Sequence, residues 1–451
     1  MDSESSQPDI GQLAEWDRHY VWHAFTQMQD YDPLVIQSAR GCVLTDIHGN
    51  ELIDAVSSVW CNVHGHAHPL INAAISEQLN QVAHVTSLGM SNPTSIRLAQ
   101  RLAEVTPEGL EHTFFSGDGA SSVEVALKMA FQYWHQRKDP KPAKNTYIAL
   151  GSAYHGDTLG SVSVGGVARF HEMFEPLLFN VIRVENPNTY RLPDGISQEQ
   201  ATPYYLAKLE ETLKQHHEQV AAMVIEPLIQ GAAGLIMQPE GYLRGVRELT
   251  QKYDVLLIAD EVAVGFGRTG TMFACEQESV SPDIMCLAKG ITGGYLAMSA
   301  TIATTEIWQE FLGDPVKTFY HGHTYAGNPL AAAAALASLD LFELEQTLAN
   351  VRQREAELKQ LLTSRLSDHP LVGDIRQRGL VAGIELVSNK QTRQPLDPAL
   401  GIGGKVCLAA REKGVWLRPL RDTLVIMPPL SINQQQLTQI VEAIAYGLDQ
   451  V

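Results

Sequence analysis

The chain has 451 residues, 45% of them hydrophobic and 19% charged, which is ordinary for a folded protein and long enough for two domains. A formal net charge of -18 argues against nucleic acid and against anionic membrane surfaces as partners. Five scattered cysteines without metal-finger spacing, an acidic start (Met1 to Glu4) and the lack of an apolar stretch of about twenty residues predict a cytoplasmic protein with neither signal peptide nor membrane span.

The N-terminal part shows two textures. Residues 1–18 are polar, and we expect a loose arm there. Between about 41 and 60, two short apolar runs flank His48-Gly49-Asn50, which is a hairpin turn signal.

From about residue 70 to 330, helical patterns alternate with short apolar strands, which is typical of a mostly parallel sheet covered on both faces. The remainder has an α+β texture, with a long helical stretch from Leu330 to about Leu362, strands near 379–387 and 415–418, and a final helix from Asn433. We therefore predict an α/β fold, with a large domain of residues 70–335 and a smaller α+β domain made of residues 1–69 and 336–451.

The first candidate site element is the run from Ser116 to Ser122, which contains Gly117 and Gly119 and follows Phe114-Phe115. A glycine-rich turn that opens a helix offers free N–H groups and a favourable dipole to a phosphate. A plain strand–helix connection with serine caps would look the same. The second element is Tyr154-His155-Gly156-Asp157, whose aromatic ring could stack on a flat cofactor or simply pack in a loop.

The third element is a pair of strand ends. Asp260 closes the apolar run from Val255 to Ala259, and Lys289 follows the run from Ile284 to Ala288. Runs of this kind read as buried parallel strands, and ligands bind at the carboxyl ends of such strands. A carboxylate and an amine would then meet at one site, as pyridoxal phosphate requires: the lysine forms the Schiff base, and the aspartate keeps the pyridine nitrogen protonated. A surface lysine and an N-cap aspartate are the alternative.

Two other kinds of site are disfavoured. The alternating histidines 64, 66 and 68, and 321 and 323, resemble a zinc set, but Gly65 and Pro69 indicate a loop and no carboxylate completes the ligands. We therefore expect no metal. A Walker phosphate loop is absent as well.

Together, the motifs resemble those of the class III, fold type I pyridoxal-phosphate aminotransferases along nearly the whole chain. The matching pieces are Tyr154 to Thr158, Ile225-Glu226-Pro227, Ala259 to Val262, Gly265 to Gly270, Leu287 to Gly290, and His321 to Pro329. The resemblance implies that Lys289 is the Schiff-base lysine, that Asp260 pairs with the pyridine nitrogen, and that Tyr154 stacks on the ring. Gly119 and Ala120 would bind the phosphate. His323 and Thr324 would complete the cofactor site, with Thr324 reaching across the interface of a homodimer.

Within the class, the chain resembles the branch that aminates 8-amino-7-oxononanoate to 7,8-diaminononanoate in biotin biosynthesis. The pieces that carry this are Val21-Trp22-His23, Ser57 to Trp60, Val123 to Trp134, Phe273 to Glu276, and Arg418-Pro419 with Met427 to Pro429. The resemblance assigns the substrate carboxylate to Arg418, whose charged, forked guanidinium suits that task. The other substrate-binding residues that it implies are Phe25, Val59, Trp60, Asp157 and Gly322.

Four positions of the chain bear on the identity of the amino donor. The branch that uses S-adenosylmethionine has tyrosine at Phe25, a Trp-Trp pair at Val59-Trp60, proline at His323 and phenylalanine at Tyr325. The present residues look more like a second branch whose donor is lysine. A sulfonium and an adenosine favour aromatic walls, so we expect lysine rather than S-adenosylmethionine.

Two alternatives stay open. One is another class III aminotransferase that acts on ω-amino acids or diamines, against which Trp60 and Arg418 argue. The other is a cofactor-binding regulator without turnover. It would need a DNA-binding module, for which neither the length nor the charge leaves room.

Overall fold

The computed structural model describes residues 10–451, and the predictions for Met1 to Glu4 and for the first half of the arm lie outside this range. The prediction of a loose arm is wrong from residue 10 onward, because Ile10–Tyr20 form helix α1. Leu13, Ala14 and Glu15 are strong helix formers, and Arg18 and His19 in the last turn suit the negative end of the helix dipole. Local helix propensity outweighs the polar composition here.

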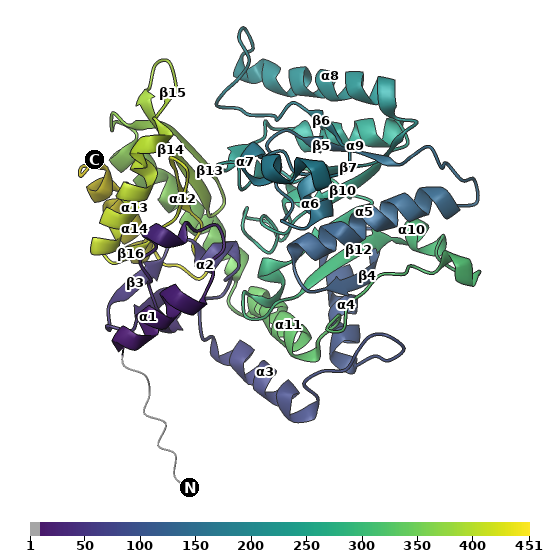
Figure 1. Cartoon of the computed structure of the whole chain (residues 1–451), viewed down its shortest axis with the longest axis horizontal. Helices are drawn as coiled ribbons and strands as arrows, with labels where there is room; N and C mark the ends of the chain where they lie inside the picture. Colours follow the sequence, from purple (N-terminus) through teal and green to yellow (C-terminus); the bar gives the residue numbers. More distant parts are fainter. Residues whose placement is uncertain (1–9) are drawn as a thin grey trace.

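The N-terminal strands form a sheet with a strand from the far end of the chain. The antiparallel strands β1 (Ile36–Arg40), β2 (Val43–Asp46) and β3 (Glu51–Asp54) are joined by β16 (Val415–Trp416), which runs parallel to β3. The predicted hairpin is confirmed, with Gly49 in the left-handed region at φ 83°. In Figure 1 these purple strands lie among the yellow-green C-terminal elements.

The central sheet has seven strands in the order β4-β12-β11-β10-β7-β5-β6. Only β12 (Ser299–Thr304) runs against the others, so the prediction of a mostly parallel α/β sheet is confirmed. The remaining strands are β4 (Leu110–Ser116), β5 (Thr146–Leu150), β6 (Ile182–Val184), β7 (Val220–Ile225), β10 (Leu256–Asp260) and β11 (Ile284–Leu287).

Helices cover both faces of this sheet because successive strand residues point to opposite sides. Ile258 packs in the cluster that contains α5 (Gly119–Gln136), while its neighbours Leu257 and Ala259 pack in the cluster on the other face. That second face is covered by α4 (Pro93–Val105), α8 (Gln198–His216), α9 (Tyr242–Lys252) and α11 (Pro329–Leu344). Helix α3 (Pro69–Gln81) packs against α11.

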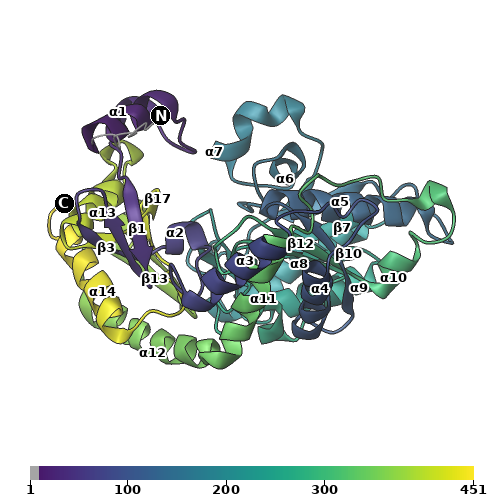
Figure 2. The same ribbon diagram turned by 90° about the horizontal axis from the view of Figure 1, so that it is seen from below.

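The C-terminal part consists of a sheet with helices against it (Figures 1 and 2). The helical stretch expected from 330 to 362 is two helices, since Gln346 at φ 52° breaks it. The predicted strand near 379–387 is β14, and the predicted final helix is α14, which Asn433 caps. The elements are α12 (Thr347–Leu366), β13 (Val372–Arg378), β14 (Val381–Asn389), β15 (Gln394–Pro395), α13 (Ile402–Glu412), β17 (Pro419–Leu420), β18 (Thr423–Ile426) and α14 (Gln434–Leu448).

Short elements line the region between the two parts. They are α2 (Ser57–Trp60), α6 (Leu159–Ser163), α7 (Ala168–His171), β8 (Ile229–Gln230), β9 (Ile236–Met237) and α10 (Thr305–Gln309). In Figure 2, α1 and α7 lie at the same edge of the molecule, one on each part. Within residues 10–451, no helix combines the length and the apolar character needed to cross a bilayer.

Candidate active site

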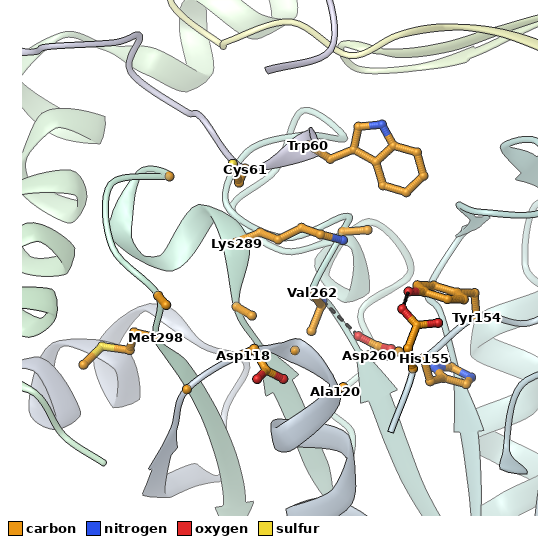
Figure 3. Close-up of a pocket in the computed structure, with 18 of the residues that line it drawn as sticks. Trp60, Cys61, Asp118, Ala120, Tyr154, His155, Asp260, Val262, Lys289 and Met298 are labelled. Atoms are coloured by element: carbon orange, nitrogen blue, oxygen red, sulfur yellow. Dashed lines mark hydrogen bonds and ion pairs between the residues drawn. The ribbon is translucent and has the colours of Figure 1, made fainter. Parts of the chain in front are cut away.

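A cavity of about 670 Å³ lies at the carboxyl ends of the central strands (Figure 3). Its walls come from the segment after β3, the start of α5, and the loops after β5, β7, β10 and β11. Asp260 and Lys289 both line it, so the predicted meeting of a carboxylate and an amine at one edge of the sheet is confirmed. The two side chains meet because β10 and β11 are parallel neighbours.

Lys289 reaches into the cavity between Trp60 on one side and Asp260 on the other (Figure 3). Its Nζ lies 5.2 Å from the centre of the Trp60 ring. Burial lowers the pKa of the ammonium, against the opposing pull of the Asp260 and Glu226 carboxylates. An amine of this kind is more readily deprotonated, as a nucleophile or a proton carrier requires.

Asp260 is paired with His155, a residue that sequence reasoning mentioned only as part of a motif. His155 Nδ1 lies 2.7 Å from Asp260 Oδ2, and Asp260 Oδ1 accepts from the amide of Val262 at 3.1 Å. Burial alone would lower the pKa of His155, but the hydrogen bond and the charge of Asp260 raise it. The raised pKa favours a protonated, cationic His155 beside the Asp260 carboxylate in this buried wall. His155 Nε2 has no hydrogen-bond partner among the described residues.

A second buried carboxyl, Glu226 at the end of β7, was not predicted as a site residue. One oxygen accepts from the amide of Tyr154 at 2.9 Å, and the other accepts from the amide of Gly231 at 2.7 Å. Burial raises the pKa of Glu226 to about 7, although His155 and the two amides oppose this. The sequence signals were its position after an apolar strand and its place in the Ile225-Glu226-Pro227 motif, to which no role had been assigned.

An aromatic chain runs from the cavity outward. The Tyr154 hydroxyl donates to Asp157 at 2.6 Å, and burial together with this bond raises the pKa of the phenol. The Tyr154 ring lies 5.6 Å from Phe170 on α7, and Phe170 lies 5.5 Å from the exposed Phe25. Phe170 was not predicted, because nothing in the sequence places α7 beside residue 25.

The N-terminus of α5 opens onto the cavity. The Asp118 side chain caps this helix by accepting from the Ser121 amide at 2.8 Å, and Gly119 and Ala120 lie in the cavity wall. Close packing favours glycine here: a Cβ on Gly119 would lie 2.7 Å from a side-chain methyl of Val262, and one on Gly156 (φ 123°) would lie 2.4 Å from the Ala120 Cβ. The amides at this helix start can hold a phosphate.

The residue set fits pyridoxal phosphate. It combines a lysine with a lowered pKa, an aspartate hydrogen-bonded to His155, an aromatic ring at the cavity wall and a helix N-terminus. The unpaired and fully buried His155 Nε2 indicates that this histidine serves Asp260 rather than a second hydrogen bond in the protein core.

Several predicted residues lie outside the cavity wall. Val59, Gly322, His323, Thr324 and Arg418 are exposed. His323 Nε2 would lie 3.5 Å from a Cβ on Gly117, so this side chain borders the start of α5. Arg418 makes no hydrogen bond or ion pair with any residue from 10 to 451, and the structure does not bring it to Lys289. No group of histidine, cysteine and acidic residues in the same range could hold a metal.

The similarity to known proteins extends over nearly the whole chain. A family model described as "Aminotransferase class-III" matches residues 26–448. A relative from Nitratidesulfovibrio vulgaris, named adenosylmethionine-8-amino-7-oxononanoate aminotransferase, is 50% identical over 96% of this chain and 80% of its own length.

Two solved structures resemble the chain over nearly its whole length. A protein of the same name from Methanocaldococcus jannaschii is 40% identical, with a TM-score of 0.92 over 98% of this chain and all of that one. An (S)-enantioselective omega-transaminase from Thermomicrobium roseum is 34% identical, with a TM-score of 0.95 over 98% of this chain and 99% of that one.

Proposed function

Because the chain belongs to the class-III aminotransferases, which are pyridoxal-phosphate enzymes, we propose that it transfers an amino group to 8-amino-7-oxononanoate. The product is 7,8-diaminononanoate, and the step belongs to biotin biosynthesis. The observation that carries this choice of substrate is the 50% identity, over 96% of the chain, to a relative named for it.

In this proposal the cofactor supplies a ring that draws electrons away from the substrate carbon. Lys289 would hold the cofactor by its Nζ and, when released, would carry the proton between carbon atoms. Asp260 would face the ring nitrogen. Its carboxylate, paired with His155, would favour the protonated ring.

The cavity wall would orient the cofactor. Tyr154 would cover one face of the ring, with its loop fixed by Glu226 and its hydroxyl by Asp157. The amides of Gly119 and Ala120 would bind the phosphate, with His323 at the same border. These contacts hold the reacting atoms in one geometry, and such positioning removes much of the activation barrier.

Substrate selection would come from the open side of the cavity. Phe25, Val59, Trp60, Asp157 and Gly322 would contact the carbon chain. The Arg418 guanidinium, which is exposed and has no partner within residues 10–451, would be free to pair with the substrate carboxylate.

A homodimer would complete the site. Segments 83–92 and 318–328 lie together, since Asn328 donates to the carbonyl of Ala83 at 3.3 Å and the rings of His84 and Tyr325 are 4.7 Å apart. The segments expose large apolar side chains, namely Leu88 (86% exposed), Met90, Tyr320 and Tyr325. Such a patch is typical of an interface. Across it, Thr324 would reach the cofactor phosphate of the partner subunit.

The domain division is proposed as residues 70–335 for the cofactor domain and 1–69 with 336–451 for the small domain. The pairing of β3 with β16 supports this, because it places the N-terminal strands in one sheet with the C-terminal part.

The donor is S-adenosylmethionine or lysine. The names of the two relatives favour S-adenosylmethionine, and the Phe25–Phe170–Tyr154 chain offers the aromatic faces that a sulfonium prefers. Phe25, Val59, His323 and Tyr325 were the grounds for expecting lysine. We give more weight to the aromatic chain, which the sequence did not reveal, and propose S-adenosylmethionine.

The deciding experiment mixes the cofactor-loaded enzyme with each donor alone and follows the absorbance of the bound cofactor. S-adenosylmethionine should convert it to the pyridoxamine form, and lysine at about a hundredfold higher concentration should not. The reverse result would support lysine as the amino donor. 8-Amino-7-oxononanoate should then return the pyridoxal form.

A second candidate function is the transfer of an amino group from ω-amino acids or diamines to a ketone or keto acid. The TM-score of 0.95 to the Thermomicrobium roseum omega-transaminase favours it. Return of the pyridoxal form by simple ketones or pyruvate, and not by 8-amino-7-oxononanoate, would establish this alternative.

A further inference from the structure

The segment that carries Trp60 has an unusual backbone. Ser57 (φ 47°), Ser58 (φ 64°, ψ -84°) and Trp60 (φ 63°) all have positive φ, which side chains other than glycine rarely adopt. Such conformations persist only where the surroundings impose them, and they gather at functional sites. The result here is the placement of the Trp60 ring 5.2 Å from Lys289 Nζ.

The side chain of Asp54, at the end of β3, holds this backbone conformation through hydrogen bonds. Its carboxylate is completely buried and accepts from the Ser58 amide at 2.7 Å and from the Val56 amide at 3.3 Å. It therefore binds the backbone on both sides of Ser57.

His66 extends the same network to the far end of the segment. Its Nε2 donates to Asp54 at 2.9 Å, and its Nδ1 accepts from the side chain of Asn62 at 3.4 Å. Asn62 follows Trp60 by two residues, so the strained turn is held at both its entrance and its exit. None of Asp54, His66 and Asn62 lines the cavity.

Arg268 provides a second anchor, independent of Asp54. It donates to the Ser57 hydroxyl at 2.9 Å and to the carbonyl of Asn62 at 2.7 Å. The Ser57 hydroxyl in turn donates to the carbonyl of Met427 at 2.8 Å. The segment would thus stay attached without Asp54, while the conformation of Ser58 to Trp60 would be free to relax.

The neighbours of Trp60 explain why its position matters. A Cβ on Gly231 would lie 3.1 Å from the Trp60 ring, so the ring packs closely against the loop after β7. In that loop Glu226 accepts hydrogen bonds from the amides of both Gly231 and Tyr154. In Figure 3 the ring lies on the side of Lys289 away from Asp260. Trp60 therefore limits the space in which the lysine amine and a substrate can move.

We propose that Asp54 is a positioning residue for the amino transfer: through the strained backbone of residues 56–60 it holds Trp60 beside Lys289. The inference rests on the proposed function. Asp54 touches neither substrate nor cofactor, and its whole effect on the reaction passes through the Trp60 ring.

The test is a double-mutant cycle of Asp54→Asn with Trp60→Ala. Asparagine keeps the size, but its amide group would face the N–H of either Ser58 or Val56, so one bond to the backbone is lost. In the enzyme with Trp60, the donor half-reaction should lose about 10- to 100-fold in kcat/KM, as expected for a misplaced active-site group. In the Trp60→Ala enzyme, the same Asp54→Asn change should alter kcat/KM less than about twofold.

Asp46→Asn is the matched control. Asp46 is also buried and accepts from two backbone amides, those of His48 and Asn50, both at 2.8 Å, but it holds the β2–β3 turn away from the cavity. It should leave kcat/KM unchanged. Asp54→Glu provides a second variant that retains the charge and should recover part of the activity if Asp54→Asn is too unstable to assay.

Hydrogen exchange in the cofactor-free protein provides a readout without activity. Asp54→Asn should speed exchange in a peptide that covers residues 55–62, and Asp46→Asn should not. Equal losses of kcat/KM in the Trp60 and Trp60→Ala enzymes would overturn the proposal, and so would unchanged exchange. The proposed acceptor fails separately, when the wild-type pyridoxamine form does not react with 8-amino-7-oxononanoate.

Discussion

Replacing His155 by glutamine should slow the amino transfer, because it removes the positive charge that faces Asp260. Glutamine still offers an N–H donor, so the 2.7 Å hydrogen bond to the Asp260 carboxylate keeps its charged acceptor but loses the charge on its donor. Hydrogen bonds that involve a charged group contribute about 1.5–3 kcal/mol, roughly twice as much as neutral ones, so the loss of one of the two charges removes part of that contribution. That part, about 1–2 kcal/mol, corresponds to roughly 5- to 30-fold in a rate that depends on the charge of Asp260.

The assay is the donor half-reaction of the cofactor-loaded enzyme, followed by the absorbance of the cofactor in a stopped-flow instrument. His64→Gln is the matched control, because His64 is equally buried but bonds to the Ser338 hydroxyl at 3.1 Å, and burial lowers its pKa to about 3. The His64 side chain is therefore neutral in the assay, and His64→Gln removes no charge. An unchanged rate in His155→Gln, or an equal loss in His64→Gln, would refute the reasoning.

Three further predictions concern the same site. Lys289→Ala should bind cofactor but not turn over, and after borohydride reduction of the wild type, mass spectrometry should find the cofactor on Lys289; an adduct on another lysine would contradict the assignment. Arg418→Ala should raise KM for 8-amino-7-oxononanoate by about 30- to 1000-fold, because a lost charge-assisted pair costs about 2–4 kcal/mol. The KM for amines without a carboxylate should not change. An equal rise in KM for both kinds of substrate would assign Arg418 a structural role instead. Burial raises the folded-state pKa of Glu226 to about 7, so the buried carboxyl binds its proton more tightly than the unfolded one. As pH rises from about 4.5 to about 7, the free energy of unfolding of the cofactor-free wild type should therefore fall relative to that of Glu226→Gln. Denaturant titrations that give the same difference at every pH would disprove this.

The sequence predicted the elements of the site that lie at strand ends. Asp260 and Lys289 each follow an apolar run, and the rule for parallel sheets is enough to bring them together. The start of α5 was predicted in the same way, from glycines that precede a helix. These predictions depend on local patterns and on one topological rule.

The residues that were missed depend on contacts between distant segments. The roles of His155 and Glu226 come from burial and from distances to Asp260, Tyr154 and Gly231, which no periodicity encodes. Phe170 belongs to the site because α7 lies beside residue 25. The break at Gln346 was also missed, because the helix formers on both sides of it read as one helix.

The pairing of β3 with β16 has a consequence for the synthesis of the chain. Ile53 lies opposite Val415, so the N-terminal sheet lacks its last strand until nearly the whole chain has left the ribosome. At about 5–20 residues per second, that delay is roughly 20–70 s. During this time the edge of β3 is open to pairing with other chains. The central sheet, whose strands all lie between residues 110 and 304, can fold first. A nascent chain stalled before residue 415 should therefore contain a folded central sheet and an N-terminal segment that chaperones bind.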